Sequence, residues 1–119
     1  DKPFDLSIDD TSVYFTLAQK GQLMKVSKTG GAVTKIASGL APSARIAADA
    51  KGIVTTAAAV GSDGTEMLVF MGSDGSSPTP LASIARNHSA DAVARDQKGG
   101  YCASYNPDTR KATLYSRAR

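Results

Sequence analysis

The sequence of 119 residues has the length of one ordinary domain, and with 41% hydrophobic and 21% charged residues its composition is that of a folded protein rather than a disordered one. Its formal net charge of +3 comes from 14 basic and 11 acidic side chains spread along the chain, so we expect no nucleic-acid partner. A lone cysteine, Cys102, excludes an intramolecular disulfide, and with a single histidine in the chain it cannot form a zinc cage.

The first predicted unit covers residues 4–41 and contains four short strands. The aspartate Asp9 follows the innermost strand, and an apolar strand at 13–16 comes next. Strands at 22–27 and 32–37 complete the unit, separated by turns that contain glycine. The β-branched and aromatic residues of these short segments favour strands over helices. We predict that 13–16 is buried on both faces.

The second predicted unit covers residues 42–86 and repeats this order. Asp49 follows an inner strand, and further strands are predicted at 53–56, 66–71 and 79–85. The part from 68 to 71 is apolar throughout, so we predict that it too is buried on both faces.

The alanine-rich run 44–59 is the one segment where a helix competes with strands, because alanine is the best helix former. Gly52 and the β-branched block 53–56 argue against a helix, as does the alignment with the first unit. We therefore predict strands here.

The third predicted unit covers residues 87–119 and has three strands, the last at 111–116. Asp96 occupies the position of Asp9 and Asp49, which gives spacings of about 40 and 47 residues, the length of one four-stranded propeller blade. We predict an all-β protein made of β-propeller blades within the single segment 1–119. A two-sheet sandwich of the same eleven strands is the alternative.

The pattern of residues 8–16, followed by 21–26 and 30–33, resembles one blade of the NHL-type and TolB-like six-bladed propellers of bacteria. An aspartate, an aromatic strand, a basic residue between apolar residues and a two-glycine turn recur there. The similarity is good over 4–50 and weaker beyond. It implies a platform that binds proteins, peptides or sugars on the loops at one end of a ring. The streptogramin-inactivating lyases resemble this class too, but the histidine pair that would serve as acid and base is missing here.

Fewer than three full blades cannot close a propeller, which typically needs four to eight. An open array would leave apolar faces in water. We therefore expect an incomplete ring that is completed either by copies of this chain, with a six-bladed dimer as the simplest case, or by blades on a companion chain. No cofactor is expected.

No apolar stretch approaches the length of a membrane-spanning helix, so no membrane span is expected. The chain begins at Asp1 rather than methionine, which suggests a processed N-terminus or a piece of a longer protein. We expect a secreted or periplasmic location on this ground and on family habit.

The three repeated aspartates are candidate binding residues. They could line a central channel and hold a cation. The alternative is that each caps the turn to the next strand by accepting backbone N–H bonds, and a repeated local structure explains a repeated residue better. Turn capping is the favoured interpretation, and no metal site is predicted.

Two further residues are candidates for binding. His88 could act as a general base, but no partner for it is evident, so a loop position is favoured. Tyr105 lies beside the turn at 106–108, where an aromatic ring could contact a sugar or a peptide. Cys102 is expected to be a buried, unreactive thiol.

No arrangement of residues in the sequence indicates catalysis. The leading hypothesis is a non-enzymatic binding or interaction module that presents a ligand-binding or protein-binding face on propeller loops. The alternatives are a part of a propeller enzyme, a lyase or hydrolase whose catalytic groups lie on further blades, and a carbohydrate-binding lectin.

Overall fold

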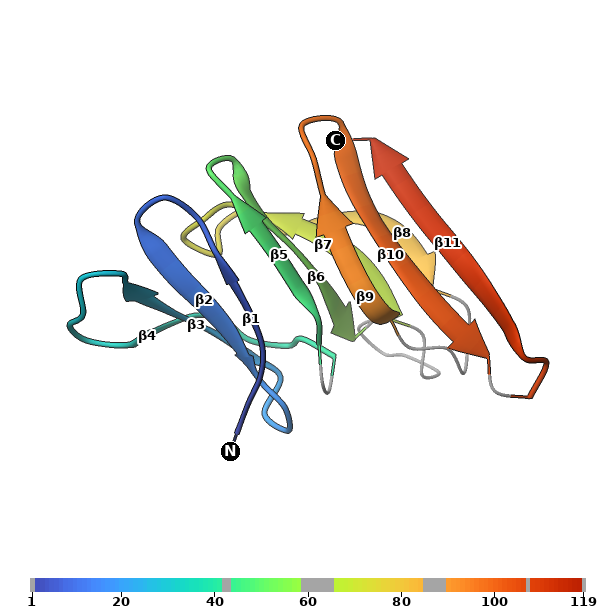
Figure 1. The fold of residues 1–119 in the computed structure, drawn as a ribbon, viewed down its shortest axis with the longest axis horizontal. Helices are drawn as coiled ribbons and strands as arrows, with labels where there is room; N and C mark the ends of the chain where they lie inside the picture. Colours follow the sequence, from blue (N-terminus) through green and yellow to red (C-terminus); the bar gives the residue numbers. More distant parts are fainter. Residues whose placement is uncertain (1, 42–43, 59–65, 85–89, 107, 119) are drawn as a thin grey trace.

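The computed structural model describes residues 2–41, 44–58, 66–84, 90–106 and 108–118 (Figure 1). In this part of the chain the protein is all-β, with eleven strands in three antiparallel sheets and no helix. It accordingly contains no helix that is long and apolar enough to cross a membrane.

The strands divide into sheets as four, four and three, which confirms the predicted grouping. Sheet 1 contains β1 (Pro3–Ile8), β2 (Ser12–Leu17), β3 (Gln22–Ser27) and β4 (Thr34–Ala37). Sheet 2 contains β5 (Ile46–Asp49), β6 (Gly52–Ala58), β7 (Glu66–Met71) and β8 (Thr79–Ile84). Sheet 3 contains β9 (Ala90–Arg95), β10 (Gly99–Asn106) and β11 (Lys111–Ala118).

Two alternatives raised by the sequence are therefore wrong. The eleven strands form three sheets, not the two of a sandwich. The alanine-rich run forms β5 and β6 instead of a helix, because a turn at Ala50 and Lys51 reverses the chain and pairs Ile46 with Thr55. Gly52 has a φ of 142°, which residues with a side chain rarely adopt.

The repeat in the sequence is also a repeat of strand register. The first hairpin of every sheet pairs equivalent residues: Leu6 with Phe15, Ile46 with Thr55, and Val93 with Cys102. The second and third strands also agree: Thr16 pairs with Leu23, Thr56 with Leu68, and Ala103 with Leu114. Because side chains alternate between the two faces of a strand, equivalent residues point to equivalent faces.

The first strands of the three sheets lie next to one another. Strand β5 lies between β1 and β9, and the remaining strands of each sheet extend outward from this row (Figure 1). Sheets 1 and 3 therefore each pack one face on sheet 2, which is covered on both faces. We call these two contacts joint 1, between sheets 1 and 2, and joint 2, between sheets 2 and 3.

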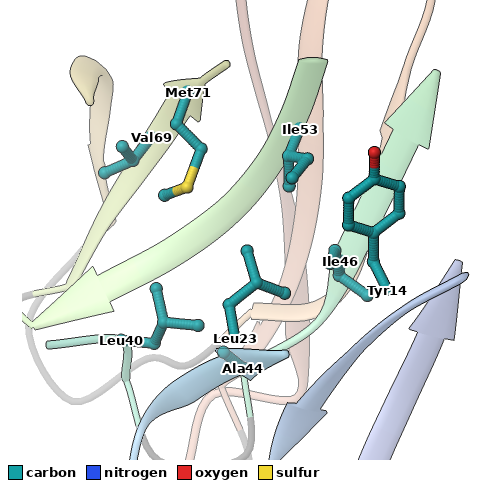
Figure 2. Packing of buried hydrophobic residues seen from close by; sticks show 8 residues of the cluster. All are labelled: Tyr14, Leu23, Leu40, Ala44, Ile46, Ile53, Val69 and Met71. Carbon is teal, nitrogen blue, oxygen red and sulfur yellow. The ribbon is translucent and has the colours of Figure 1, made fainter. Parts of the chain in front are cut away.

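Joint 1 encloses the larger apolar cluster. Tyr14 and Leu23 of sheet 1 are fully buried against residues of sheet 2 such as Ile53 (Figure 2). Full burial of a side chain of this size stabilises the fold by about 1.5–3 kcal/mol. The outer part of this joint is closed by backbone contact, since a Cβ added to Gly75 would collide with the carbonyl oxygen of Ile36.

Joint 2 encloses a second cluster. Val54, Leu68 and Ile84 of sheet 2 are fully buried, and Cys102 of sheet 3 packs against them. Gly100 lies so close to Val54 that a Cβ there would approach its methyl groups to 3.1 Å. The absence of a side chain at this position lets the two sheets meet.

Burial on both faces was predicted for two strands and holds for one. In β7, Leu68 faces joint 2 and Val69 faces joint 1, and both are buried. The prediction was wrong for β2, where Tyr14 is buried but Val13 and Phe15 are half-buried. The physical reason is that Val13 and Phe15 face away from sheet 2, where no described part of the chain packs on sheet 1.

Candidate functional site

The three repeated aspartates lie at equivalent hairpin turns, which follow one another along the upper side of Figure 1. Each carboxylate accepts a hydrogen bond from the backbone N–H two residues further on. The N···O distances are 2.9 Å for Asp9 and Thr11, 2.7 Å for Asp49 and Lys51, and 2.8 Å for Asp96 and Lys98. This geometry is that of an Asx-turn. The favoured turn-capping role is confirmed at all three positions.

In the first sheet, Asp9 also accepts a hydrogen bond from Tyr14. The phenol oxygen is 2.6 Å from the carboxylate, and the ammonium of Lys25 lies 5.3 Å from the centre of the tyrosine ring. Burial and the hydrogen bond to Asp9 raise the pKa of Tyr14 to about 12. Burial alone would raise the pKa of Asp9, but the hydrogen bonds from Tyr14 and the backbone outweigh it and lower that pKa.

The third sheet repeats this pair in a looser form. The phenol oxygen of Tyr101 lies 3.3 and 3.4 Å from the two carboxylate oxygens of Asp96, at the exposed surface. Backbone N–H bonds from Lys98 and Gly99 lower the pKa of Asp96. Partial desolvation and the adjacent carboxylate raise the pKa of Tyr101.

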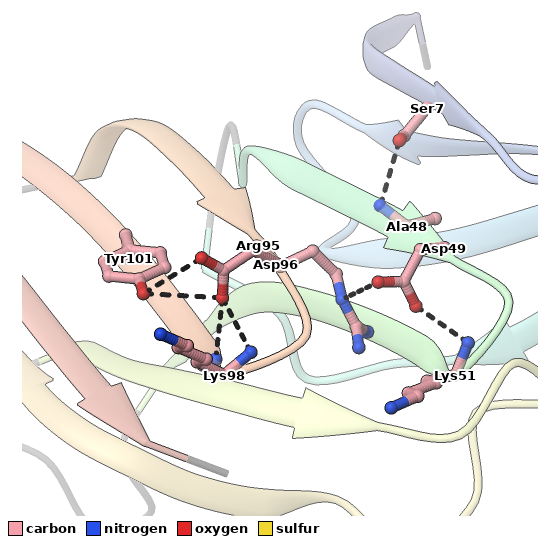
Figure 3. A network of polar contacts seen from close by, with 9 residues as sticks. Ser7, Ala48, Asp49, Lys51, Arg95, Asp96, Lys98 and Tyr101 are labelled. Atoms are coloured by element: carbon pink, nitrogen blue, oxygen red, sulfur yellow. Dashed lines mark hydrogen bonds and ion pairs between the residues drawn. The ribbon is translucent and has the colours of Figure 1, made fainter.

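The second sheet has no tyrosine at this position, because Val54 stands there. Asp49 instead forms an ion pair with Arg95 of sheet 3, with 2.8 Å between Nε and the carboxylate oxygen (Figure 3). The side chain of Arg95 is only 2% exposed, and its guanidinium carbon lies 4.9 Å from the centre of the Phe70 ring. This carboxylate therefore links two sheets.

The electrostatics of these pairs favour a structural role. A general acid or base works best with a pKa near the working pH. Here the carboxylate pKa values of Asp9 and Asp96 are lowered and the phenol pKa values of Tyr14 and Tyr101 are raised, so every one of them moves further from neutrality. The pairs remain charged carboxylates and neutral phenols across the physiological range.

Sequence reasoning identified the aspartates but missed their partners. A signal was available, because a tyrosine follows Asp9 and Asp96 by five residues while Val54 breaks the pattern after Asp49. That break marked the second aspartate as the one in need of a different partner. Arg95 itself could not be identified from spacing, because it comes from another sheet.

A polar hollow lies at the same end of sheet 3. Its lining includes Lys98, Tyr101, Ser116 and Ala118, and its volume is about 480 Å³, within the range of small-molecule sites. Ser116 pairs with Tyr101 across the sheet, so both lie on the face turned away from sheet 2. An ammonium group and two hydroxyls together suit an anionic or hydroxylated group.

The other two candidate residues are not brought to this place. Tyr105 is in β10, where its backbone pairs with Ala112, and six residues of strand separate it from Gly99, or roughly 20 Å. Its side chain and the whole of His88 lie outside the described residues. The expected binding role of both stays a prediction.

Two further sites raised by the sequence can be described. Cys102 is buried, as predicted, and burial together with Glu66 raises its thiol pKa to about 11, which disfavours the reactive thiolate. Where the structure describes the chain, no group of three His, Cys, Asp or Glu side chains is close enough to hold a metal ion. The repeated aspartates therefore do not converge on one point.

The two ends of the array expose apolar side chains. On the outer face of sheet 1, Leu6 is 61% and Ile8 is 52% exposed. On the outer face of sheet 3, Leu114 is 73% exposed. Contiguous apolar patches mark interaction surfaces, and Leu6 and Ile8, two residues apart on one strand, share such a face.

No protein-family model matches this chain, and no curated protein matches it significantly.

Proposed function

We propose that the protein is a non-enzymatic interaction module built of β-propeller-like blades, that further blades complete its ring, and that it presents a binding face on the loops along one side. The observation that carries this proposal is the pair of uncovered apolar faces at the two ends of a regular array of sheets.

The regularity of the array supports blades. The three sheets share one strand register, and their first strands lie side by side as the inner strands of propeller blades do. The third sheet has three strands in the described chain, so it lacks the counterpart of β4 and β8. A further chain segment at that edge would make it equal to the others.

The end faces support completion by further blades. In a repeat array each unit buries its apolar face on the next unit, and end units need a polar outer face to remain soluble. Sheet 1 ends instead on Leu6 and Ile8, and sheet 3 on Leu114. A closed ring would cover both ends.

The side with the aspartate turns is the proposed binding face. Lys51 and Lys98 are exposed on two of its turns. Anionic peptides and sugars offer the carboxylates and hydroxyls that such groups bind. The pKa directions of the nearby carboxylates and phenols support binding rather than acid–base catalysis.

Completion of the ring is tested by the mass of the chain in solution. Sedimentation should give at least twice 12.3 kDa, because the two end faces find partners in other copies. A stable species of one chain that stays soluble at high concentration would refute the proposal of an incomplete ring.

The binding face is tested with glycan and acidic-peptide arrays. Wild-type protein should bind a subset of probes, and a Lys51→Ala, Lys98→Ala double variant should lose that binding, because both ammonium groups are exposed on the aspartate turns. Lys111→Ala is the matched control, since Lys111 is exposed at the opposite end of sheet 3. Equal binding by all three proteins, or none by the wild type, would refute this face.

A further inference from the structure

The two uncovered faces carry residues at positions that are buried wherever two sheets meet. Leu23, Leu68 and Leu114 occupy one position of the repeat. The first two are fully buried in joints 1 and 2, whereas Leu114 is 73% exposed. The side chain at this position is therefore buried in sheets 1 and 2 and exposed in sheet 3.

The opposite face gives the same result. Ile46, Val93 and Leu6 occupy another single position. Ile46 is buried in joint 1 and Val93 packs into joint 2, whereas Leu6 is 61% exposed. One end of the array therefore presents the first half of a joint, and the other end presents the second half.

The two half-joints differ from joint 1 in opposite directions. On sheet 3, alanines replace larger side chains that sheet 1 presents to joint 1: Ala92 stands for Asp5, Ala94 for Ser7, and Ala103 for Thr16. On sheet 1, larger side chains replace those that sheet 2 presents to joint 1: Ile8 stands for Ala48, Phe15 for Thr55, and Leu17 for Ala57. At these positions one face has smaller side chains and the other has larger ones, which favours contact between the two faces, although Val13 is smaller than Ile53, whose position it occupies.

A hollow marks the place where volume is lost. It lies on the outer face of sheet 3, has a volume of about 140 Å³, and is lined by apolar residues that include Ala92, Ala94, Ala103, Tyr101 and Leu114. A cavity of about 150 Å³ accepts a benzene ring, so this hollow can take one large apolar side chain. In joint 1, Ile46 packs in one cluster with Tyr14 and Leu23 (Figure 2). Leu6 is the equivalent of Ile46, and Tyr101 and Leu114 are the equivalents of the other two.

The aspartate turns fit the same pairing. Asp49 has no tyrosine partner, and the sheet that follows it supplies Arg95. Asp9 has its tyrosine, and the following sheet has Ala48 at the position of Arg95. In sheet 1, Ile8 occupies this position and cannot form an ion pair. Sheet 1 therefore suits a preceding sheet in which a tyrosine already binds the aspartate. Sheet 3, with Asp96 and Tyr101, is such a sheet.

We propose that the outer face of sheet 3 of one copy packs on the outer face of sheet 1 of a second copy, in the register of joint 1. Leu6 of the second copy enters the alanine-lined hollow, and Ile8 lies beside Ala94, as Ala48 lies beside Ser7 in joint 1 with 2.9 Å between its amide nitrogen and Oγ. This inference rests on the proposed function and names the partner as the chain itself. Two such head-to-tail contacts close a ring of six sheets from two copies.

Mixed disulfide trapping tests the head-to-tail contact. Ile8→Cys and Ala94→Cys are prepared as separate variants, mixed, and mildly oxidised. The mixture should form linked pairs of chains, and each variant alone should not, because neither position meets its own copy. Buried Cys102 does not interfere, since its thiol pKa is about 11. Thr109→Cys, in an exposed turn, is the control that should not link to either variant.

A charge exchange gives a second and independent measurement. Ile8→Lys alone and Ala94→Glu alone should each weaken association at least about tenfold, because a charge is buried without a partner. Mixed in equal amounts they should regain it, since one joint then holds a Lys–Glu pair and the other the wild-type pair. Thr109→Lys is the control, because Thr109 is exposed in the turn between β10 and β11.

The outcomes separate this inference from the proposed function. Linked pairs in the mixture only, with rescue by the charge exchange, support the head-to-tail contact. An assembly of two or more chains that shows no mixed disulfide and no rescue overturns the contact while the interaction module stands. A wild-type protein that remains a stable single chain overturns both.

Discussion

Joints 1 and 2 connect equivalent faces of equivalent sheets, yet they use different polar contacts. In joint 1, side chains of β1 accept hydrogen bonds from backbone amides of β5: Asp5 Oδ2 from Ile46 at 2.9 Å, and Ser7 Oγ from Ala48 at 2.9 Å. In joint 2, the corresponding side chains are Arg45 and Ala47, and the ion pair of Asp49 and Arg95 crosses between the strands instead.

The difference shows how one backbone repeat tolerates two chemistries. The outward amides of a first strand must be satisfied when a neighbour covers them. Asp5 and Ser7 do so directly because they are spaced two residues apart and meet alternate amides. Alanine at position 47 cannot accept a hydrogen bond, and joint 2 relies on a buried guanidinium and apolar packing.

The ion pair of joint 2 gives the largest expected effect. Asp49→Asn keeps an oxygen for the Lys51 amide but removes the charge that faces the buried Arg95. We expect a loss of about 3 kcal/mol in the free energy of unfolding, at the lower end of the cost of breaking a buried pair because Asp49 is partly exposed. Urea denaturation measures it. Asp10→Asn, at an exposed neighbouring turn, should change stability little, and equal losses would show that the ion pair does not hold joint 2.

The outer end of joint 1 gives the next effect. Gly75→Ala should cost about 2 kcal/mol, because the residue has a φ of 81° and a methyl group would collide with the Ile36 carbonyl. Gly30→Ala is the matched control, since Gly30 also has a positive φ, 94°, but has nothing within 4 Å of an added Cβ. Thermal unfolding measures the loss of stability in each variant. The amount by which Gly75→Ala loses more than Gly30→Ala is the cost of the collision between the two sheets. No excess would mean that this end of joint 1 yields easily.

The pair of Asp9 and Tyr14 beside joint 1 gives a smaller effect with a pH signature. Tyr14→Phe removes a hydrogen bond to a charged acceptor and should cost about 1.5 kcal/mol near neutral pH. The folded pKa of Tyr14 is raised from 10.0 to about 12, so its stabilising contribution is complete below pH 10 and is lost as the pH rises through 12. The pKa of Asp9 is lowered from 3.8, so its contribution is present above pH 3.8 and is lost as the pH falls below that value.

Denaturation of the wild type and of Tyr14→Phe at a series of pH values measures both the alkaline and the acidic loss of stability. The variant should lack the alkaline decline that Tyr14 causes. Tyr101→Phe is the comparison, and it should change stability less because its hydrogen bonds are 3.3 Å or longer and exposed. Equal effects of the two substitutions would contradict the ranking of the pairs.

The single hydrogen bond from Ser7 gives the smallest effect. Ser7→Ala leaves the Ala48 amide without its acceptor and should cost about 1 kcal/mol. Ser27→Ala, which removes a hydroxyl bonded only at an exposed turn, is the control. A Ser7 variant as stable as the wild type would show that water replaces the hydroxyl and that joint 1 resembles joint 2 more closely.

Much of the fold was predictable because each strand is a local pattern. Short β-branched segments ended by glycine turns gave eleven strands, and the recurring aspartate gave their grouping. The predicted burial of 13–16 failed for a tertiary reason, since apolar residues on both faces of β2 do not reveal whether a neighbour covers each face. The same residues that misled this prediction, Val13 and Phe15, form part of the uncovered face.

The candidate site divides in the same way. Turn capping by the aspartates was predictable because donor and acceptor are two residues apart. The ion pair with Arg95 and the polar hollow were not, because they join residues from different strands or sheets.

By itself, the sequence determined the strands, their turns and their order within each sheet, since all of these arise from contacts between residues close in the chain. Only the tertiary structure decided which faces meet, which carboxylate receives a guanidinium and which apolar rows remain open. Those outcomes depend on packing between segments some 40 residues apart, and the same alternating pattern of side chains fits a covered face and an uncovered one equally well.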